Sequence, residues 1–406
     1  MYRARQTLLI TTVALLLVFG LTMLYSTTYD IFGEALLQRQ LVWIVLGAGG
    51  ALLLSALDYR WLSRYAGWML LALGICLAYL AIANVMNHRV MPEGIRSVAR
   101  ALPLVSGLHV GSARWLGLKS VRVQPSEFAS LAIILFLSRY FSFHGRHLHT
   151  FYRGFFKPMM VVGVLVGLIL LGGDLSTTVI TGGMIFWLCF FAGVRLRFLV
   201  LTVLVGAVVG LTALHIDETR MSRTLYYRSP EQYQQRETYQ LWMSQLAMGS
   251  GGWSGVGFTE GRIKRRYLPE SHTDFIIAII GEELGFLGVA AAMVFYATMV
   301  FSILWIGAAA PDREGMMVCS GVALALGLRA FVNIGVVSGF LPTTGVTAPL
   351  ISYGGSSAVA SLLGAGLVLN VGRIASRAAL QRAASANSEV AEPPRYDLSH
   401  RQLPTS

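Results

Sequence analysis

The chain has 406 residues, of which 55% are hydrophobic and 13% are charged, and its formal net charge is +12 at pH 7. This composition excludes an ordinary soluble domain, in which about a quarter of the residues are charged. Apolar runs close to the roughly 20 residues that a helix needs to cross hydrocarbon recur along the chain. The first run is too long, and too soon followed by another, to be a cleaved signal peptide. We therefore predict an all-α, multi-pass membrane protein.

The charges of the short loops orient the predicted helices. Arginines such as Arg3, Arg60 and Arg195 fall on one side of the predicted bundle. The positive-inside rule makes that side cytoplasmic, so both termini are expected there. The segment 274–305 is long for one span, and we expect a single tilted or kinked helix. Ten transmembrane helices are predicted, near 7–26, 40–57, 65–85, 127–143, 157–172, 175–194, 197–215, 274–305, 315–339 and 355–373.

Two long segments on the other side of the membrane, about 86–126 and 216–273, are rich in Arg and Lys. The second is the large extracytoplasmic loop between the seventh and eighth helices. An anionic extracytoplasmic partner is the simplest explanation for these charges. Nucleic acid is a poor candidate there, since no DNA- or RNA-binding motif is present. We expect residues 1–373 to form the membrane domain, and the polar segment 374–406 to be a disordered cytoplasmic tail.

Asp274 follows a basic run and precedes a long apolar segment, and it has two interpretations. In the first, Ser271 caps the helix and Asp274 is an acid in its first turn. In the second, Asp274 is a general base at the boundary between water and lipid, with Lys264, Arg265 and Arg266 nearby in the sequence. The two interpretations are compatible, because a helix terminus would hold the carboxylate in place.

Glu127 stands in the first turn of the fourth predicted helix, after Pro125, which is a good helix start. Near Arg114 and Trp115 it could also hold a cation or a sugar. The glycine-rich stretch 249–257 lacks the lysine and serine of a phosphate-binding loop, and is expected to be a close-packed turn. Other charged residues in or next to the spans are expected mainly to form ion pairs that fix helix packing: Asp174, Glu282, Glu283 and Arg329.

Six short motifs occur in order along the chain, and together they closely resemble the SEDS family (shape, elongation, division and sporulation proteins), whose main branches are FtsW and RodA. The resemblance covers about residues 7–373, and the sequence of residues 336–345 resembles the FtsW branch more than the RodA branch. The motifs are Ala-Arg-Trp at 113–115, Gln-Pro-Ser-Glu at 124–127, Tyr-Leu-Pro-Glu-Ser-His-Thr-Asp-Phe at 267–275, Gly-Glu-Glu-Leu-Gly at 281–285, Asn-Ile-Gly-Val-Val at 333–337 and Ser-Tyr-Gly-Gly-Ser-Ser at 352–357.

The resemblance implies an inverting peptidoglycan glycosyltransferase that polymerises lipid II at the outer face of the cytoplasmic membrane and releases undecaprenyl diphosphate. It implies that Asp274 is the catalytic acid–base residue. It also implies a class B penicillin-binding protein transpeptidase as partner, together with proteins of a division or elongation complex. A divalent cation, Mg²⁺ or Mn²⁺, is expected, with Glu127 as a candidate ligand. The residues expected to contact substrate are Arg114, Trp115, Glu127, Lys264, Arg265, Arg266, Glu270, His272, Thr273, Ser352, Tyr353 and Ser356.

The chain departs from the family pattern at several positions. Ser130 stands where the family usually has a lysine, three residues after Glu127, so Glu127 needs another partner. Two other functions remain open. A lipid II flippase would need essential groups along a midplane path, such as Glu282, Glu283 and Arg329, whereas an enzyme would gather them at the outer face. A non-catalytic scaffold of the division complex is the third hypothesis.

Overall fold

The computed structural model describes residues 2–88, 91–108, 112–118, 121–216, 221, 225, 227, 231, 238–265 and 267–391. Within these residues nine helices are long and apolar enough to cross a membrane, and the shorter apolar helix α8 matches the remaining predicted span. The prediction of an all-α, multi-pass membrane protein is therefore confirmed. The helices are α1 Tyr2–Phe32, α2 Ala35–Ala56, α4 Ala66–Met86, α6 Pro125–Phe143, α7 Lys157–Leu171, α8 Leu175–Phe191, α9 Leu196–Ile216, α12 Ile276–Gly307, α13 Arg313–Val337 and α14 Gly355–Ala391.

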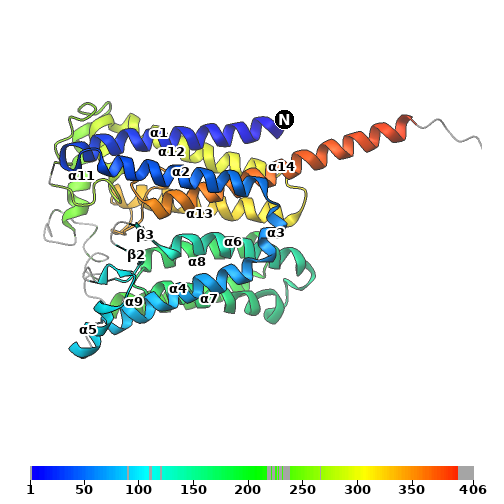
Figure 1. Cartoon of the computed structure of the whole chain (residues 1–406), viewed down its shortest axis with the longest axis horizontal. Helices are drawn as coiled ribbons and strands as arrows, with labels where there is room; N and C mark the ends of the chain where they lie inside the picture. The colour runs from blue at the N-terminus through cyan, green and yellow to red at the C-terminus, as the bar shows by residue number, and fades with distance from the viewer. Residues whose placement is uncertain are drawn as a thin grey trace, which may run out of the picture.

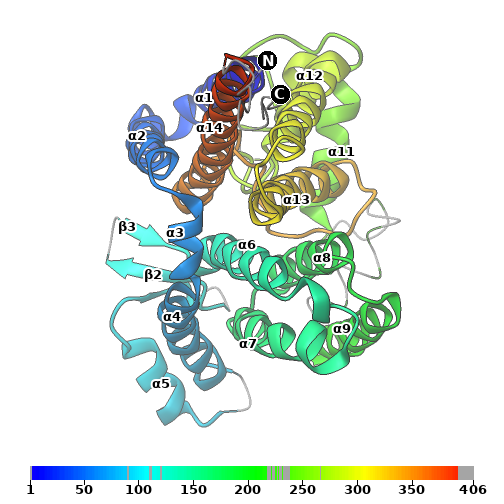
Figure 2. The ribbon, with the colours of Figure 1, turned by 90° about the vertical axis from the view of Figure 1, so that its right-hand side faces the viewer.

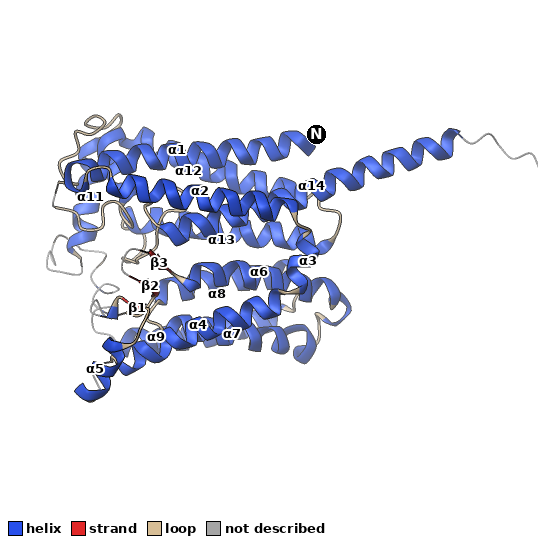
Figure 3. Cartoon of the chain, viewed as in Figure 1, coloured by secondary structure: helices blue, strands red, loops and turns tan. Residues whose placement is uncertain are grey.

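The helices lie side by side with their axes along one direction (Figure 1). The N-terminus and the free end of α14 lie at one end of the bundle, which we call the inner end. The short strands lie at the opposite, outer end, where they are the red segments of Figure 3. Large apolar side chains remain exposed along the outward faces of α2, α4 and α9, including Leu52, Ile75 and Val208. Such faces suit contact with hydrocarbon.

The bundle divides into two sets of helices, which Figure 2 shows end-on. Helices α1, α2, α12, α13 and α14 pack together in what we call the α13 group, and α4, α6, α7, α8 and α9 form the α6 group. The two groups meet mainly where α13 packs against α6 and α8. At this seam the backbones approach closely, because a Cβ on Gly321 of α13 would lie 2.6 Å from the side chain of Ile134 of α6. Small residues commonly permit such close helix packing in membranes.

Short elements cover the outer end, and sequence analysis did not predict them. Three strands form an antiparallel sheet in the order β1-β2-β3, in which Trp115 pairs with Ser106 and Leu116 with Val123. These elements are α5 Glu93–Ala101, β1 Val105–Ser106, β2 Trp115–Leu118, β3 Val121–Val123 and α11 Tyr239–Gly251. At the inner end lie α3 Tyr59–Arg64, the 3₁₀ turn η2 Gly145–His147 and the π-helical turn η3 Phe151–Phe156.

Helix α12 is kinked at Gly285, where φ is 66° and ψ is −162°. The kink frees backbone carbonyl groups of the preceding turn. The carbonyl of Glu282 accepts a hydrogen bond from the amide of Val256 at 3.0 Å, and that of Glu283 from Gly257 at 3.1 Å. The expected close-packed glycine turn therefore lies against the kink, since a Cβ on Gly255 would fall 2.0 Å from the Glu283 carbonyl oxygen.

Helix α14 extends far beyond the bundle (Figure 1). Sequence analysis expected residues 374–406 to be disordered, but the helix continues to Ala391. This correction has a local cause, because the segment 374–386 is rich in alanine, which has the highest helix propensity. Residues 392–406 lie outside the described part of the chain.

Candidate active site at the outer end of the helices

Asp274 lies in a turn just before α12. The helix starts at Ile276 with Phe275 at the N-cap position and no side-chain cap, which corrects the expectation that Ser271 caps the helix and that Asp274 lies in its first turn. The turn is closed by the amides of Thr273 and Phe275, which both donate to the carbonyl of Glu270 at 3.2 Å. The carboxylate of Asp274 is therefore placed by a loop, and it is half-buried rather than exposed.

Asn333 of α13 holds this loop in place through hydrogen bonds to its backbone. Its side-chain nitrogen, Nδ2, donates to the backbone carbonyl of Asp274 at 2.8 Å and to that of Val346 at 2.6 Å. Asn333 is buried on α13, so the loop carrying Asp274 and the segment 340–354 are held to the same point of one helix. Sequence analysis quoted Asn333 only as part of a motif and did not name it as a site residue.

Asp274 and Arg114 converge on Gly345. A Cβ on Gly345 would lie 3.3 Å from Oδ2 of Asp274 and 3.8 Å from Nη1 of Arg114. The guanidinium is held from the other side, because Nη2 donates to the carbonyl of Gly173 at 2.7 Å and Nη1 lies 3.8 Å from Oδ1 of Asp174. A carboxylate from the turn before α12 and a cation from the residue before β2 thus both approach a residue that has no side chain.

Asp174 and Gln124 support the Arg114 side of the site. Asp174 caps α8 by accepting from the Thr177 amide at 3.1 Å, and its other oxygen accepts from Nε2 of Gln124 at 3.0 Å. The backbone amide of Gln124 donates to Oγ of Ser356 at 3.0 Å. Gln124 belongs to the Gln-Pro-Ser-Glu motif and Asp174 is the acid before the sixth predicted span. Both were visible in the sequence, but sequence analysis assigned neither Gln124 nor Asp174 to the site.

His272 and Tyr353 connect the Asp274 loop to the start of α14. The Tyr353 amide donates to the carbonyl of His272 at 3.0 Å, and the two rings lie 5.8 Å apart. Burial lowers the pKa of the His272 imidazole, and the charge of Glu270 partly offsets this effect. The ring is therefore mainly neutral at pH 7. Thr273 lies beside it and donates to the carboxylate of Glu270 at 2.7 Å.

Ser352 and Ser356 are both buried, and the hydroxyl of each accepts a hydrogen bond from a backbone amide. Oγ of Ser352 accepts from the Ala348 amide at 2.9 Å, which closes the turn before α14. Trp115 follows Arg114 directly and begins β2. These residues lie around the Asp274 and Arg114 pair and shape the segments that carry it.

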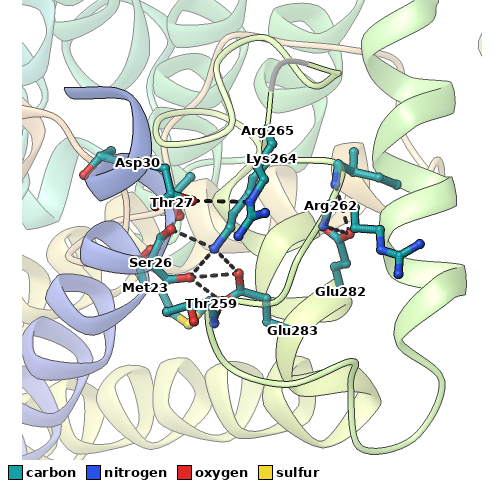
Figure 4. A network of polar contacts seen from close by, with 12 residues as sticks. Met23, Ser26, Thr27, Asp30, Thr259, Arg262, Lys264, Arg265, Glu282 and Glu283 are labelled. Atoms are coloured by element: carbon teal, nitrogen blue, oxygen red, sulfur yellow. Dashed lines mark hydrogen bonds and ion pairs between the residues drawn. The ribbon is translucent and has the colours of Figure 1, made fainter. Parts of the chain in front are cut away.

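Lys264 lies apart from that pair, in the buried network of Figure 4. It is 2% exposed, and its Nζ contacts Oε1 of Glu283 at 2.5 Å and both oxygens of Ser26 at 2.8 Å. The ammonium of Lys264 is paired with Glu283 and hydrogen-bonded to Ser26, so this geometry does not support its predicted contact with substrate. Arg265 is exposed and lies 3.3 Å from Asp30, and the predicted residue Arg266 lies outside the described residues.

Glu282 holds the same loop by a different contact. Its Oε1 accepts from the amides of Arg262 at 2.7 Å and Ile263 at 3.0 Å. Glu283 also accepts from the Thr259 amide at 3.2 Å. Both glutamates therefore bind the loop 259–264 to α12, where the flippase hypothesis had placed groups of a transport path.

Glu127 is buried and forms an ion pair with Arg329 of α13. Its carboxylate is therefore engaged by a guanidinium in this structure. Among the residues that the structure describes, no group of three or more His, Cys, Asp or Glu side chains could hold a metal ion. The metal ligand role of Glu127 stays a prediction.

Comparisons with known proteins agree with this architecture. A probable peptidoglycan glycosyltransferase FtsW of Coxiella burnetii is 35% identical over 337 residues, covering 82% of this chain and 85% of that protein. The corresponding protein of Geobacter metallireducens is 32% identical over 362 residues, covering 87% and 90%. The stage V sporulation protein E of Bacillus subtilis is 32% identical over 375 residues, covering 90% and 96%.

Solved structures show the same fold. A chain of a peptidoglycan synthase complex, described as coordinating polymerization and crosslinking, matches with a TM-score of 0.70 at 28% identity, covering 90% of this chain and 97% of that one. The rod shape determining protein RodA of Thermus thermophilus matches with a TM-score of 0.64 at 28% identity, covering 90% and 95%. The model of the FtsW, RodA and SpoVE family, described as "Cell cycle protein", matches residues 6–377. This chain therefore belongs to the FtsW, RodA and SpoVE family.

Proposed function

We propose that this protein polymerises lipid II into glycan strands at the outer face of the cytoplasmic membrane, in cell division or cell-shape maintenance. The observation that carries the proposal is the meeting of Asp274 and Arg114 at Gly345, at the outer end of the bundle. A base and a cation side by side are what an acceptor hydroxyl and an anionic leaving group require.

The chemistry is one inverting displacement. Asp274 takes the proton from the 4-hydroxyl of the acceptor's GlcNAc, and that oxygen forms a bond to the anomeric carbon of the donor's MurNAc. The bond from that carbon to undecaprenyl diphosphate breaks, and Arg114 stabilises the negative charge that develops on the diphosphate. Arg114 can do so because Gly173 and Asp174 already fix its orientation. No step of this mechanism uses a metal ion.

The relatives support this activity, since two of them are named probable peptidoglycan glycosyltransferases. The match to a chain of a peptidoglycan synthase complex supports a crosslinking partner, for which a class B penicillin-binding protein transpeptidase is our candidate. Basic residues near the inner end, such as Arg5, Arg60 and Arg373, support cytoplasmic termini. A flippase is less well supported, because Glu282, Glu283 and Arg329 are engaged in contacts that fix the fold.

The decisive experiment is polymerisation of labelled lipid II by the purified protein together with its transpeptidase partner. Asp274→Asn should lower the rate by at least about 10²-fold, the usual contribution of a general base. Glu34→Gln, which removes an exposed carboxylate in the turn between α1 and α2, is the matched control and should retain activity. An Asp274→Asn protein as active as the wild type would refute the base. Absence of glycan strands from a folded, partner-bound wild type would favour a scaffold or a flippase.

A further inference from the structure

We propose that Arg329 is a positioning residue for polymerisation, and that its ion pair with Glu127 sets the separation between Asp274 and Arg114. We call these two residues the seam pair, because they join α6 to α13 where the two helix groups meet. The inference rests on the proposed function, since its main readout is glycan polymerisation.

The seam pair is buried and specific. The side chains of Arg329 and Glu127 are 8% and 9% exposed, and Nη1 of Arg329 donates to Oε2 of Glu127. The second nitrogen, Nη2, lies 3.5 Å from Oγ of Ser130. A buried charge whose partner is removed is strongly unfavourable, so the pair holds the two helices at a fixed distance and rotation.

Each member of the seam pair lies close in sequence to an anchor of the site. Glu127 follows Gln124 by three residues, and Gln124 binds Asp174, which faces Arg114. On the other helix, Arg329 precedes Asn333 by four residues, or about one helical turn, and Asn333 holds the Asp274 loop.

A shift of one helix group relative to the other would therefore change the distance between the base and the cation. Arg114 is held by Gly173 and Asp174 at the start of α8, in the α6 group, whereas the Asp274 loop is held by Asn333 of α13. Close packing of Gly321 against Ile134 fixes the seam nearer the inner end. The seam pair is a buried ionic contact that fixes it near the site, where the Gln124 amide also donates to Oγ of Ser356 on α14.

Ser130 explains why the cation comes from α13 in this chain. A lysine at residue 130 would stand three residues after Glu127, on the same face of α6, where it could pair with Glu127 within one helix. With serine at that position, the guanidinium of Arg329 occupies the space between Glu127 and Ser130. The cation is therefore supplied across the seam, and the pair links two helices instead of two turns of one.

The test relocates the cation. Purified wild type, Arg329→Gln, Arg329→Gln with Ser130→Lys, and Arg329→Gln with Ser130→Gln are compared for thermal unfolding and for kcat and KM of lipid II polymerisation with the transpeptidase partner. Arg329→Gln should lower kcat on the order of 10- to 100-fold with KM changed less than about twofold, since a displacement of about 1 Å can cost about 10²-fold. The added lysine neutralises Glu127 within α6 and should recover thermal stability, but kcat should stay low because the link to α13 is not restored; the uncharged glutamine of similar size should recover neither.

The outcomes separate the inference from the proposed function. An inactive wild type counts against the function itself. An active wild type with an equally active Arg329→Gln overturns the inference, as does recovery of the wild-type kcat by lysine at residue 130, because that lysine neutralises Glu127 without linking the two helices. A rise in KM alone would instead place Arg329 in substrate binding and also overturn it. If Arg329→Gln does not fold, the lysine variant decides, because it keeps a cation beside Glu127 without linking the helices: a folded protein with a lowered kcat supports the inference, and a wild-type kcat or failure to fold overturns it.

Discussion

The buried ammonium of Lys264 gives the sharpest test of the structure. Lys264→Met keeps the length of the side chain but removes its charge, which leaves the fully buried carboxylate of Glu283 without its cation. Ser26 also loses the donor that contacts its hydroxyl and its carbonyl. We expect the variant to be destabilised strongly, because the loop 259–264 is joined to α1 and α12 through this network (Figure 4).

The expected magnitude follows from burial. Removing one partner of a buried ion pair costs about 3–5 kcal/mol in the free energy of unfolding. If Lys264 instead faced the solvent to meet substrate, its replacement would change stability by only about 0.5 kcal/mol. The two interpretations of Lys264 therefore differ by a measurable amount, which does not depend on any activity assay.

The assay is denaturant and thermal unfolding of the purified protein in detergent micelles. Arg265→Met is the matched control, because it removes a cation from the same loop whose pairing with Asp30 is exposed and worth about 0–1 kcal/mol. A second variant, Lys264→Met with Glu283→Gln, removes both charges. It should be more stable than the sum of the single changes predicts, by about 0.5–3 kcal/mol.

A Lys264→Met protein that unfolds like the wild type would contradict the buried pair. So would additive effects of Lys264→Met and Glu283→Gln, because two residues in contact should be coupled. In either case Lys264 would return as a candidate for binding the diphosphate of the substrate.

Three further predictions concern the site and the kink beside it. Gly345→Ala places a methyl group 3.3 Å from Oδ2 of Asp274, so kcat for lipid II polymerisation should fall while the unfolding midpoint changes little; an unchanged kcat would show that this space is not used. Gly285→Ala should destabilise the protein by more than about 1 kcal/mol, because φ is 66° and the new Cβ would lie 2.4 Å from the Gly255 amide nitrogen; unfolding with no loss of stability would contradict the kink. Because the folded pKa of His272 is lowered, its contribution to stability is present above the unfolded pKa of about 6.5 and is lost as pH falls below it. The unfolding midpoint of the wild type should therefore fall more steeply between about pH 7 and 5 than that of His272→Gln, and parallel curves would contradict the burial of the ring.

The membrane-spanning helices of this protein were predictable because the hydrocarbon core of the membrane sets their length and apolar composition. A helix must bury about 20 apolar residues to cross hydrocarbon, so composition and length alone found the ten segments. The length of 274–305 also predicted a kinked or tilted helix. The position of the kink could not be predicted, because it depends on which glycine packs against the turn that contains Gly255. Gly285 is one of several glycines in this segment, and only the approach of Gly255 distinguishes it.

Contacts between distant segments were not predictable from the residues themselves. The basic run before Asp274 holds several cations in sequence, and nothing in their order shows that Lys264 turns inward to Glu283 while Arg265 stays exposed. Likewise the absence of a lysine at 130 indicated that Glu127 needs a partner, but not that Arg329, 202 residues away, supplies it. Sequence periodicity describes one helix at a time, whereas these ion pairs depend on how helices pack.

The charged side chains near the site divide into two kinds by their burial and pairing. Lys264 and Arg329 are matched by glutamates inside the protein, where desolvation makes an unmatched charge costly. Asp274 and Arg114 are half-buried, and both approach Gly345, which has no side chain. The internal pairs fix the positions of the segments that carry Asp274 and Arg114. If Asp274 is the base, as proposed, these pairs would contribute to the preorganisation that is the main source of electrostatic stabilisation in enzymes.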